Sequence, residues 1–297
     1  MKILVTGADG MLGSALCPAL RRRGHEVIPT DLRPVATSTQ PLDICNGPAV
    51  EQLIKTAAPD IVLHLAAETD VDRCEQEPVH AYAVNAVGTE HVVRACRAMG
   101  TRLLYMSTAA VFDGLKPTPY VETDPPNPVN VYGRTKLAGE SVVRAYPAHL
   151  IVRAGWMVGG YERDKKFVWK LLRLLEERRE LSVVTDTRGS LTFTDDLSEG
   201  IAGLIETAHV GIFHIVNHGA CSRYDIACKL LELLGRRDVT IRPVTSAAFP
   251  LPAPRPASEV LENHRLQSLG LDTMPSWDEA LRAYVQRYVA SLTVTDS

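Results

Sequence analysis

Short apolar runs alternate with amphipathic stretches over the first 155 residues. A short, continuous apolar run is typical of a strand that is buried on both faces, and apolar residues that recur every three or four positions are typical of a helix. The pattern predicts strands at 2–6, 26–30, 61–65, 102–107 and 150–154, and helices at about 11–23, 47–57, 77–99 and 131–145. Strands separated by helices indicate an α/β fold with a doubly wound parallel sheet, which is Rossmann-like.

The pattern is less regular from about residue 156 onward. It predicts helices near 165–178, 194–207, 223–234 and 277–290, and strands at 181–184 and 211–216. The proline-dense segment 249–260 still carries apolar residues, so we expect a loop that lies along the protein surface. We therefore divide the chain into a larger domain at 1–155 and a smaller C-terminal lobe at 156–297, segments of which can return to the first domain.

Composition and charge indicate a globular protein. Of the 297 residues, 45% are hydrophobic and 23% are charged, which is enough for a full core. The formal net charge is −3, and the one basic triplet, Arg21–Arg23, ends a predicted helix, where cations are favourable. We therefore expect no nucleic-acid partner. Neither a signal-peptide pattern nor a run of 18 apolar residues occurs, so we expect a cytoplasmic protein with no membrane partner.

The cysteines and histidines do not suggest a metal site. The six cysteines form no C-x-x-C pair, which favours reduced thiols over disulfides or a zinc site. His214 and His218 lie in a segment with the pattern of a strand, where four residues span roughly 13 Å, too far for two ligands of one ion. We predict no metal.

Three glycines follow the first predicted strand, in the segment VTGADGMLGSAL. Gly7 permits a tight turn, Gly10 lets the backbone approach a pyrophosphate, and Gly13 allows the first helix to pack closely on the strand. The start of that helix offers backbone N–H groups and a partial positive charge to phosphates. The sequence therefore predicts a dinucleotide-binding loop.

Asp31 follows the second predicted strand and lies 18 residues beyond Gly13 (31 − 13). An acid about 20 residues beyond such glycines hydrogen-bonds the adenosine ribose. Its charge repels a 2′-phosphate and so favours NAD, whereas Arg33 could pair with that phosphate and accommodate NADP. We expect NAD or NADP as cofactor, with NAD slightly favoured by Asp31.

Tyr132 and Lys136 are four residues apart in the segment VYGRTKLAGE, and residues at this spacing share one face of a helix. An ammonium beside a phenol favours the phenolate. We therefore expect the pKa of Tyr132 to lie below its usual value of about 10, nearer the range where a phenol donates a proton at neutral pH. The alternative is a surface tyrosine and lysine, against which stands the glycine loop at the other end of the domain.

The order of these motifs resembles the extended short-chain dehydrogenase/reductase superfamily, in which G-x-x-G-x-x-G is the usual glycine spacing. Within it the chain most resembles the dTDP-4-dehydrorhamnose reductases, from Met1 to about Tyr288, and NPVNVYGRTKLAGE at 127–140 is specific for this family. The resemblance implies an NAD(P)-dependent oxidoreductase that reduces a nucleotide-linked 4-keto-6-deoxysugar. It implies a nucleotide-sugar substrate, and a homodimer is compatible with it.

The resemblance also implies roles for individual residues. Tyr132 would donate a proton to the substrate carbonyl, Lys136 would hold the nicotinamide ribose, and Thr108 would hydrogen-bond the reacting oxygen. The residues implied to bind the cofactor are Gly7, Asp9, Gly10, Met11, Leu12, Gly13, Asp31, Leu32, Arg33, Asp43, Ile44, Leu65, Ala66, Ala67, Tyr132 and Lys136. The residues implied to border the substrate are Val71, Thr108, Ala109, Ala110, Trp156 and Arg255.

Two of these residues could instead have no role at the site. Trp156 could be a core or interface residue, and Arg255 an exposed arginine. The chain also departs from the family pattern. Ala109 and Ala110 replace the usual Asp-Tyr pair after the catalytic Ser/Thr, so we expect a wider or less polar substrate pocket, and His64 replaces an asparagine or similar residue.

Two other functions stay open. One is an extended reductase or epimerase that acts on another sugar nucleotide or on a ketone of secondary metabolism, which the Ala109 and Ala110 departures favour. The other is a non-catalytic regulatory subunit of the same fold. A binding subunit has no need of Thr108, Tyr132 and Lys136 together, so their presence argues against it.

Overall fold

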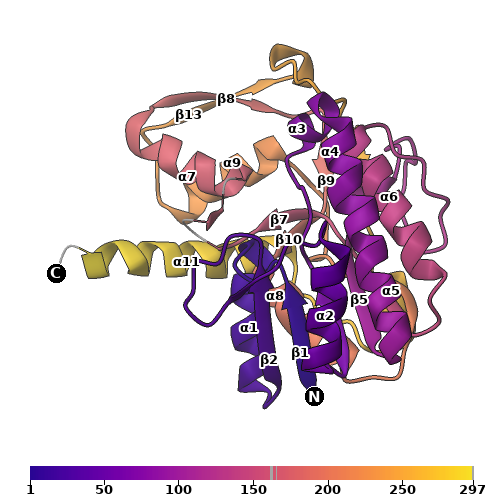
Figure 1. Cartoon of the computed structure of the whole chain (residues 1–297). Coiled ribbons are helices and arrows are strands. Elements are labelled where there is room, and N and C mark those ends of the chain that lie inside the picture. Colours follow the sequence, from indigo (N-terminus) through magenta and orange to yellow (C-terminus); the bar gives the residue numbers. More distant parts are fainter. Residues whose placement is uncertain (161–162, 165, 296–297) are drawn as a thin grey trace.

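A seven-stranded parallel sheet forms the centre of the computed structural model, which describes residues 1–160, 163–164 and 166–295, with side chains up to residue 290. The strand order is β11-β6-β5-β4-β1-β2-β3. The strands are β1 (Lys2–Thr6), β2 (Glu26–Asp31), β3 (Gln40–Pro41), β4 (Ile61–His64), β5 (Arg102–Thr108), β6 (His149–Ala154) and β11 (Gly211–His214). The predicted doubly wound sheet is confirmed (Figure 1).

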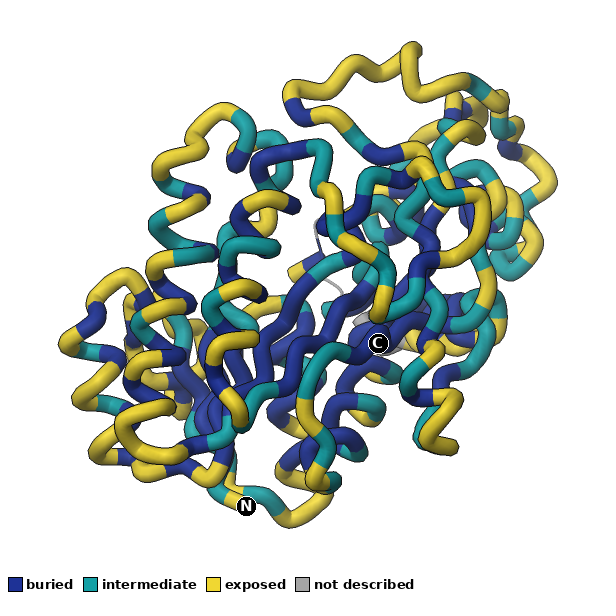
Figure 2. Tube along the Cα trace, turned by 90° about the vertical axis from the view of Figure 1, so that its right-hand side faces the viewer, coloured by how far each residue is buried: buried dark blue, intermediate teal, exposed yellow. Residues whose placement is uncertain are grey.

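Helices cover both faces of this sheet (Figure 1). On one face α1 (Met11–Arg22) packs against α8 (Thr194–Ile205), and on the other α2 (Gly47–Ala57), α5 (Thr89–Met99) and α6 (Val131–Arg144) lie in a row. Alternate residues of one strand serve the two faces: Ile3 joins the apolar core under α1 and α8, whereas Leu4 joins the core under α2 and α5. The inner strands β1, β4, β5 and β6 are therefore buried along almost all of their length (Figure 2), whereas β2 and β3 at one edge are partly exposed.

A smaller lobe has its own apolar core under α7 (Phe167–Glu177), α9 (Arg223–Leu233) and α11 (Trp277–Thr295). Its strands are β7 (Trp156–Val158), β8 (Glu180–Val184), β9 (Arg188–Gly189), β10 (Leu191–Phe193), β12 (Cys221–Ser222), β13 (Thr240–Val244) and β14 (Ser258–Glu259), which pair as β10-β7, β12-β9-β14 and β13-β8. Two elements from this half of the chain belong to the central layers instead, because β11 pairs with β6 and α8 packs on α1.

The helix predicted at 77–99 is divided in three. It consists of α4 (Pro78–Tyr82), a π-helical turn η1 (Ala83–Gly88) and α5, and it follows a short helix α3 (Val71–Gln76). The extra residue of a π-turn turns one side chain out of the regular helical row, and such turns are frequent at functional sites. Here the turn presents Asn85, which is buried.

The remaining short elements are the 3₁₀ turns η2 (Ala109–Val111) and η4 (Ser246–Ala248) and the helix α10 (His264–Ser268). Residue 165, where the sequence predicted the start of a helix, lies outside the described residues, and α7 begins at Phe167. Over the described part of the chain, no helix combines the length and the apolar character needed to cross a membrane.

Candidate active site

The carboxyl ends of β1 and β4 lie side by side at the point where the strand order reverses. Open parallel sheets bind ligands at this point. Gly7 directly follows β1 and has a φ of 70°, a backbone conformation that residues other than glycine rarely adopt. A Cβ at Gly7 would lie 2.8 Å from the backbone nitrogen of Ala66. The segment Leu65–Ala67 therefore passes directly against the glycine loop.

The start of α1 is built for close backbone packing. A Cβ at Gly13 would lie 2.4 Å from the carbonyl oxygen of Gly7, so only glycine lets the helix approach the loop. Gly10 caps the helix without a side-chain hydrogen bond, which leaves the first turn uncovered by any capping side chain. Leu12 points into the core, whereas Met11 begins the helix beside Gly160.

Both oxygens of the Asp31 carboxylate accept backbone hydrogen bonds. Oδ2 accepts from the N–H of Asp9 at 3.1 Å, and Oδ1 accepts from the N–H of Arg33 at 3.0 Å. Asp9 in turn accepts the N–H of Val35 at 2.6 Å. The two carboxylates thus tie the glycine loop to the end of β2 and to the segment after it.

The other predicted cofactor residues lie around the same edge of the sheet. Leu32 and Arg33 are exposed beyond β2. The carboxylate of Asp43 accepts the N–H of Cys45 at 2.8 Å, which forms a turn before α2. Ile44 is buried against Gly88, where an added Cβ would lie 3.0 Å from the Ile44 side chain.

Tyr132 and Thr108 meet where α6 begins beside the end of β5. Asn130 caps α6 and accepts the N–H of Gly133 at 2.8 Å. A Cβ at Gly133 would lie 2.1 Å from the carbonyl oxygen of Ala110, so this glycine lets the first turn of α6 approach η2. The Thr108 side chain therefore lies close enough to the phenol of Tyr132 to affect its pKa.

The pKa of Tyr132 is raised above its usual value by burial, while the hydrogen bond with Thr108 acts in the opposite direction. The expectation that Lys136 lowers this pKa is therefore wrong. The reason is geometric, because the Lys136 ammonium lies over the ring of Tyr105, 4.2 Å from its centroid. Lys136 is 3% exposed, and burial lowers its own pKa to about 7, against the attraction of Glu140.

His64 lies beneath Lys136 and is uncharged. Burial, with a smaller effect of the Lys136 cation, lowers the pKa of His64 to about 3. Its Nδ1 is 2.8 Å from the hydroxyl of Thr6 and its Nε2 is 3.1 Å from the hydroxyl of Thr89. The hydroxyl of Thr6 also accepts the N–H of Ala66 at 3.2 Å. Through Thr6, His64 therefore helps to hold the segment that follows β4.

Asn85, from the π-helical turn η1, links the segment after β4 to α6. Its Oδ1 accepts the N–H of Glu68 at 2.8 Å, and its Nδ2 donates to the hydroxyl of Thr135 at 3.0 Å. Thr135 donates to the carbonyl oxygen of Tyr132 at 2.8 Å. This chain of hydrogen bonds fixes the first turn of α6.

Trp156 is held on several sides in the smaller lobe. Its indole nitrogen donates to Oε2 of Glu259 at 2.6 Å, and the guanidinium carbon of Arg223 lies 4.0 Å from its ring centroid. A Cβ at Gly189 would lie 2.5 Å from the same ring. The indole therefore has a fixed orientation at the start of β7.

Arg255 is anchored rather than free. Its Nη2 lies 2.9 Å from Oδ1 of Asp72, and its Nη1 donates to the carbonyl oxygen of Ala253 at 2.8 Å. This ion pair joins α3 to the loop before β14. Val71, the first residue of α3, directly precedes Asp72 and so lies next to the contact.

Arg223 and Glu259 contact Trp156 but were not among the site residues predicted from the sequence. Burial raises the pKa of Glu259, against its contacts with Trp156 and the two arginines, and burial lowers the pKa of Arg223 to about 10. The charge of Glu259 also acts on Tyr132, so the carboxylate stands near the phenol. Glu259 lies within the stretch from Met1 to about Tyr288 that resembles the family, and this was the signal available. Arg223 opens a helix behind the Ser222 capping box, which by itself suggests only a helix start.

Ala109 and Ala110 are 1% and 5% exposed. Ala109 packs with Phe112 and Tyr120 in a small apolar cluster. Neither methyl group faces open space, so the expected wider pocket does not begin at these two side chains. Their role as substrate contacts stays a prediction.

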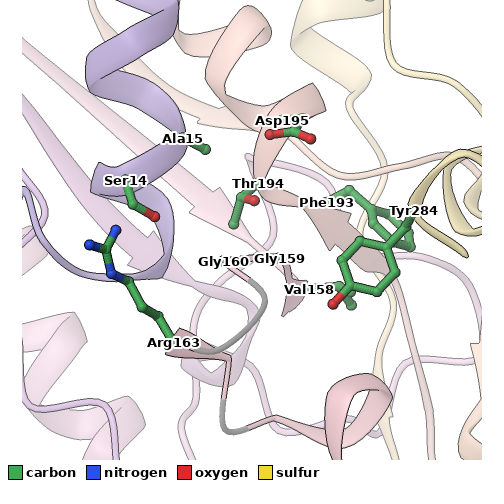
Figure 3. A pocket seen from close by; sticks show the side chains of 10 residues that line it. All are labelled: Ser14, Ala15, Val158, Gly159, Gly160, Arg163, Phe193, Thr194, Asp195 and Tyr284. Atoms are coloured by element: carbon green, nitrogen blue, oxygen red, sulfur yellow. The ribbon is translucent and has the colours of Figure 1, made fainter. Parts of the chain in front are cut away.

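A cavity of about 250 Å³ lies beside the start of α1 and is separate from the tyrosine site (Figure 3). Arg163 and Ser14 lie on one side of it and Phe193 and Tyr284 on the other, and neither Thr108, Tyr132 nor Lys136 lines it. Within the described residues, no three His, Cys, Asp or Glu side chains are grouped so that they could hold a metal ion.

The strand order, the glycine turn at its reversal, and a tyrosine and lysine one helical turn apart place the chain in the extended short-chain dehydrogenase/reductase class. Within that class it belongs to the family described as the RmlD substrate binding domain, whose model matches residues 1–290.

Several relatives at high coverage are dTDP-4-dehydrorhamnose reductases. The dTDP-4-dehydrorhamnose reductase of Streptomyces griseus is 40% identical over 285 residues, 94% of this chain and 91% of that protein. A structure of a dTDP-4-dehydrorhamnose reductase from Clostridium acetobutylicum has a TM-score of 0.90 at 37% identity, over 97% of this chain and 99% of that one. One from Bacillus anthracis, solved in complex with NADP, has a TM-score of 0.90 at 36% identity, over 96% and 99%.

Proposed function

We propose that the protein is an NAD(P)-dependent reductase of a nucleotide-linked 4-keto-6-deoxysugar, with dTDP-4-dehydrorhamnose as its substrate. The observation that carries the proposal is that the Thr108 side chain lies next to the phenol of Tyr132, one helical turn from Lys136. The names of the relatives at 36–40% identity support the choice of substrate.

The residues at the sheet edge fit a dinucleotide. Gly7 and Gly13 let the loop pack closely against the segment after β4 and the start of α1, and the uncapped first turn of α1 suits a pyrophosphate. A nicotinamide cofactor, when bound there, supplies the hydride for the reduction. Lys136 would hold the ribose next to the nicotinamide, and Leu65, Ala66 and Ala67 would line the path between them.

We propose that both NADH and NADPH serve as cofactor, with NADH slightly favoured by the charge of Asp31. Arg33 is exposed next to Asp31 and would pair with a 2′-phosphate. The NADP complex of the Bacillus anthracis relative supports this second part. Arg33→Ala should raise KM for NADPH about tenfold and leave KM for NADH unchanged. Equal effects on the two cofactors would contradict the role of Arg33.

The chain's own residues would handle the proton. Because the pKa of Tyr132 is raised, the phenol is protonated at neutral pH and is ready to donate. It gives its proton to the carbonyl oxygen as the hydride reaches the carbonyl carbon, so the ketone becomes an alcohol. Thr108 would hydrogen-bond the same oxygen and stabilise the phenolate that remains.

The smaller lobe would bind the rest of the substrate. Trp156 has a fixed orientation and would pack against the sugar ring. Val71, at the start of α3, would also border the substrate. Arg255 and the adjacent buried Arg223 would place positive charge near the diphosphate. These contacts, like the predicted roles of Ala109 and Ala110, would set substrate choice rather than the chemical step.

The test is Tyr132→Phe, assayed as NADH and NADPH oxidation with dTDP-4-keto-6-deoxyglucose, alone and with its 3,5-epimerised form. Loss of the proton donor should lower kcat about 10²- to 10⁴-fold, with cofactor affinity nearly unchanged. Tyr82→Phe, on the exposed face of α4, is the matched control and should keep wild-type activity. Activity of Tyr132→Phe within a few-fold of wild type would refute the role.

A second candidate is a reductase or epimerase of another sugar nucleotide or small ketone, favoured by Ala109 and Ala110 in place of the family's Asp-Tyr. Wild-type turnover with neither sugar form but with another nucleotide sugar would support it. Tight cofactor binding without turnover of any substrate would instead favour a regulatory subunit. A homodimer and a cytoplasmic location stay predictions, and light scattering on the purified protein checks the first.

A further inference from the structure

A buried ion pair lies one helical turn beyond Lys136. Glu140 of α6 and Arg153 of β6 are joined by two hydrogen bonds, of 2.8 Å from Nε and 2.7 Å from Nη2, and their side chains are 0% and 1% exposed. An arginine and a carboxylate joined by two bonds fix both distance and orientation. Glu140 thus ties α6 to β6 in a single geometry.

The same carboxylate also reaches β5. The hydroxyl of Ser107 donates to Oε1 of Glu140 at 2.6 Å, and Ser107 directly precedes Thr108. Glu140 is therefore connected on one side to the strand that ends in Thr108 and lies on the helix that carries Tyr132 and Lys136.

We propose that Glu140 is a positioning residue. Its contacts with Ser107 and Arg153 fix where α6 lies along β5, and the position of α6 places Tyr132 and Lys136 relative to Thr108. This inference rests on the proposed function, since it concerns the geometry of the same reaction.

Helix packing alone would not require these charges. Removing two charges from water is expensive, and well-packed apolar residues of similar volume commonly hold elements together at least as well. Arg153 also sits against other groups, with its guanidinium 5.0 Å from the Phe112 ring and Nη1 3.5 Å from the neutral His214. A pair that links two catalytic elements gives a directional contact that apolar packing cannot supply.

The charge of Glu140 has a second effect, on Lys136. Burial disfavours the ammonium, and the Glu140 carboxylate, four residues on, is the largest influence that favours it. The titratable groups that face the ammonium from the surrounding elements are His64 of β4, Cys74 of α3, Tyr105 of β5, and Tyr132 and Glu140 of α6. His64 is neutral, and burial raises the pKa of the Cys74 thiol and the two phenols. Glu140 is thus the one carboxylate of this set, and it is paired with Arg153.

Glu140→Gln is the first variant, measured as kcat and KM over pH 5 to 10. Displacement of the tyrosine and lysine should lower kcat about 10- to 100-fold, with KM for both substrates changed much less. Without the carboxylate the ammonium loses its proton more easily, so the fall of kcat at high pH should begin at a lower pH than in the wild type.

Two further variants separate positioning from stability. Glu140→Gln leaves the buried Arg153 cation without its anion, which could prevent folding. Glu140→Gln/Arg153→Met removes both charges of the pair and avoids this problem. It should show the same loss of kcat. Tyr146→Phe is the matched control. Its hydroxyl donates to the carbonyl oxygen of Thr101 at 2.8 Å, which ties the other end of α6 to the residue before β5. It should lower stability yet leave kcat and the pH profile unchanged.

The inference is overturned if the double variant folds and keeps kcat within twofold of wild type, or if Tyr146→Phe loses as much. Failure of the proposed function is a different result, in which wild-type protein turns over no nucleotide sugar. The inference is then read from NADPH binding, followed by fluorescence over the same pH range. The loss of affinity at high pH should begin earlier in the double variant, and superimposable binding curves would reject it.

Discussion

Asp72 and Arg255, 183 residues apart in the chain, form an ion pair in which Nη2 and Oδ1 are 2.9 Å apart. The same carboxylate oxygen accepts the N–H of Ala253 at 3.1 Å. One aspartate at the start of α3 thus holds both the backbone and the arginine of the loop before β14. This contact joins the sheet domain to the smaller lobe beside Tyr132.

Asp72→Ala should release that loop. We expect KM for the nucleotide sugar to rise about tenfold and kcat to change little, because Arg255 loses its place while the tyrosine site is untouched. Both side chains of the pair are about 30% exposed, so stability should fall by only ~1 kcal/mol. Steady-state kinetics measure the effect. Glu77→Ala, which breaks an exposed pair with Arg73 at the end of the same helix, should leave KM unchanged.

Trp156→Phe removes the N–H that Glu259 accepts. The Glu259 carboxylate then loses this hydrogen-bond donor, and we expect a loss of stability of about 1–3 kcal/mol together with a higher KM for the sugar nucleotide. Adding Glu259→Gln should recover part of this loss if the unpaired charge is its cause. Urea unfolding of the single and double variants measures the coupling, and strictly additive losses would show that the two side chains act independently.

Gly13→Ala should abolish cofactor binding. The added Cβ would lie 2.4 Å from the carbonyl of Gly7 and 2.5 Å from that of Ala8, so the helix must move away from the loop. Gly203→Ala in α8 is the matched control, because its Cβ would meet nothing within 4 Å. A helical glycine to alanine change in open space should add about 0.5–1 kcal/mol of stability. Fluorescence titration with NADPH compares the two, and wild-type affinity in Gly13→Ala would contradict the packing argument.

Two buried histidines should make the protein lose stability in acid. Burial lowers the pKa values of His64 and His214 to about 3, whereas in the unfolded chain both titrate near 6.5. Their neutral forms favour the folded state above pH 6.5. Between pH 6.5 and 3 only the unfolded state takes up their protons, so stability falls as pH falls.

For two such protons the slope approaches about 2.7 kcal/mol per pH unit, to which carboxylates add. His64→Asn should reduce this part of the slope by half. Denaturant unfolding of both proteins between pH 6.5 and 5 tests the claim, and parallel curves would mean that His64 is protonated in the folded state as well.

The strands of the central sheet were predictable because each is a short apolar run. β1 was placed at its observed bounds, and β2, β4, β5 and β6 within one residue. The small strands of the lobe gave no such signal. β9 has two residues, Arg188 and Gly189, and it is a strand only because β12 and β14 lie on either side of it. Pairing between segments that are far apart in sequence leaves no local pattern.

The grouping of Thr108, Tyr132 and Lys136 was predictable from the sequence, but its electrostatics were not. Spacing alone placed Tyr132 and Lys136 on one face of α6, and the structure adds that the ammonium turns toward Tyr105. Arg223 and Glu259 became candidates only once Trp156 was seen between them. A partner of this kind depends on tertiary contacts, which a single sequence does not reveal.

The return of α8 and β11 to the central layers constrains how such proteins can be recombined. Ile201, Ile205 and Phe213 fill the same core as Ile3 and Leu16, although in the chain they lie between two parts of the smaller lobe. A chimaera that exchanged everything after residue 155 for the corresponding half of a relative would therefore graft a foreign layer onto the sheet. To transfer substrate preference alone, the exchanged pieces must be taken from either side of 194–214 and leave that stretch native.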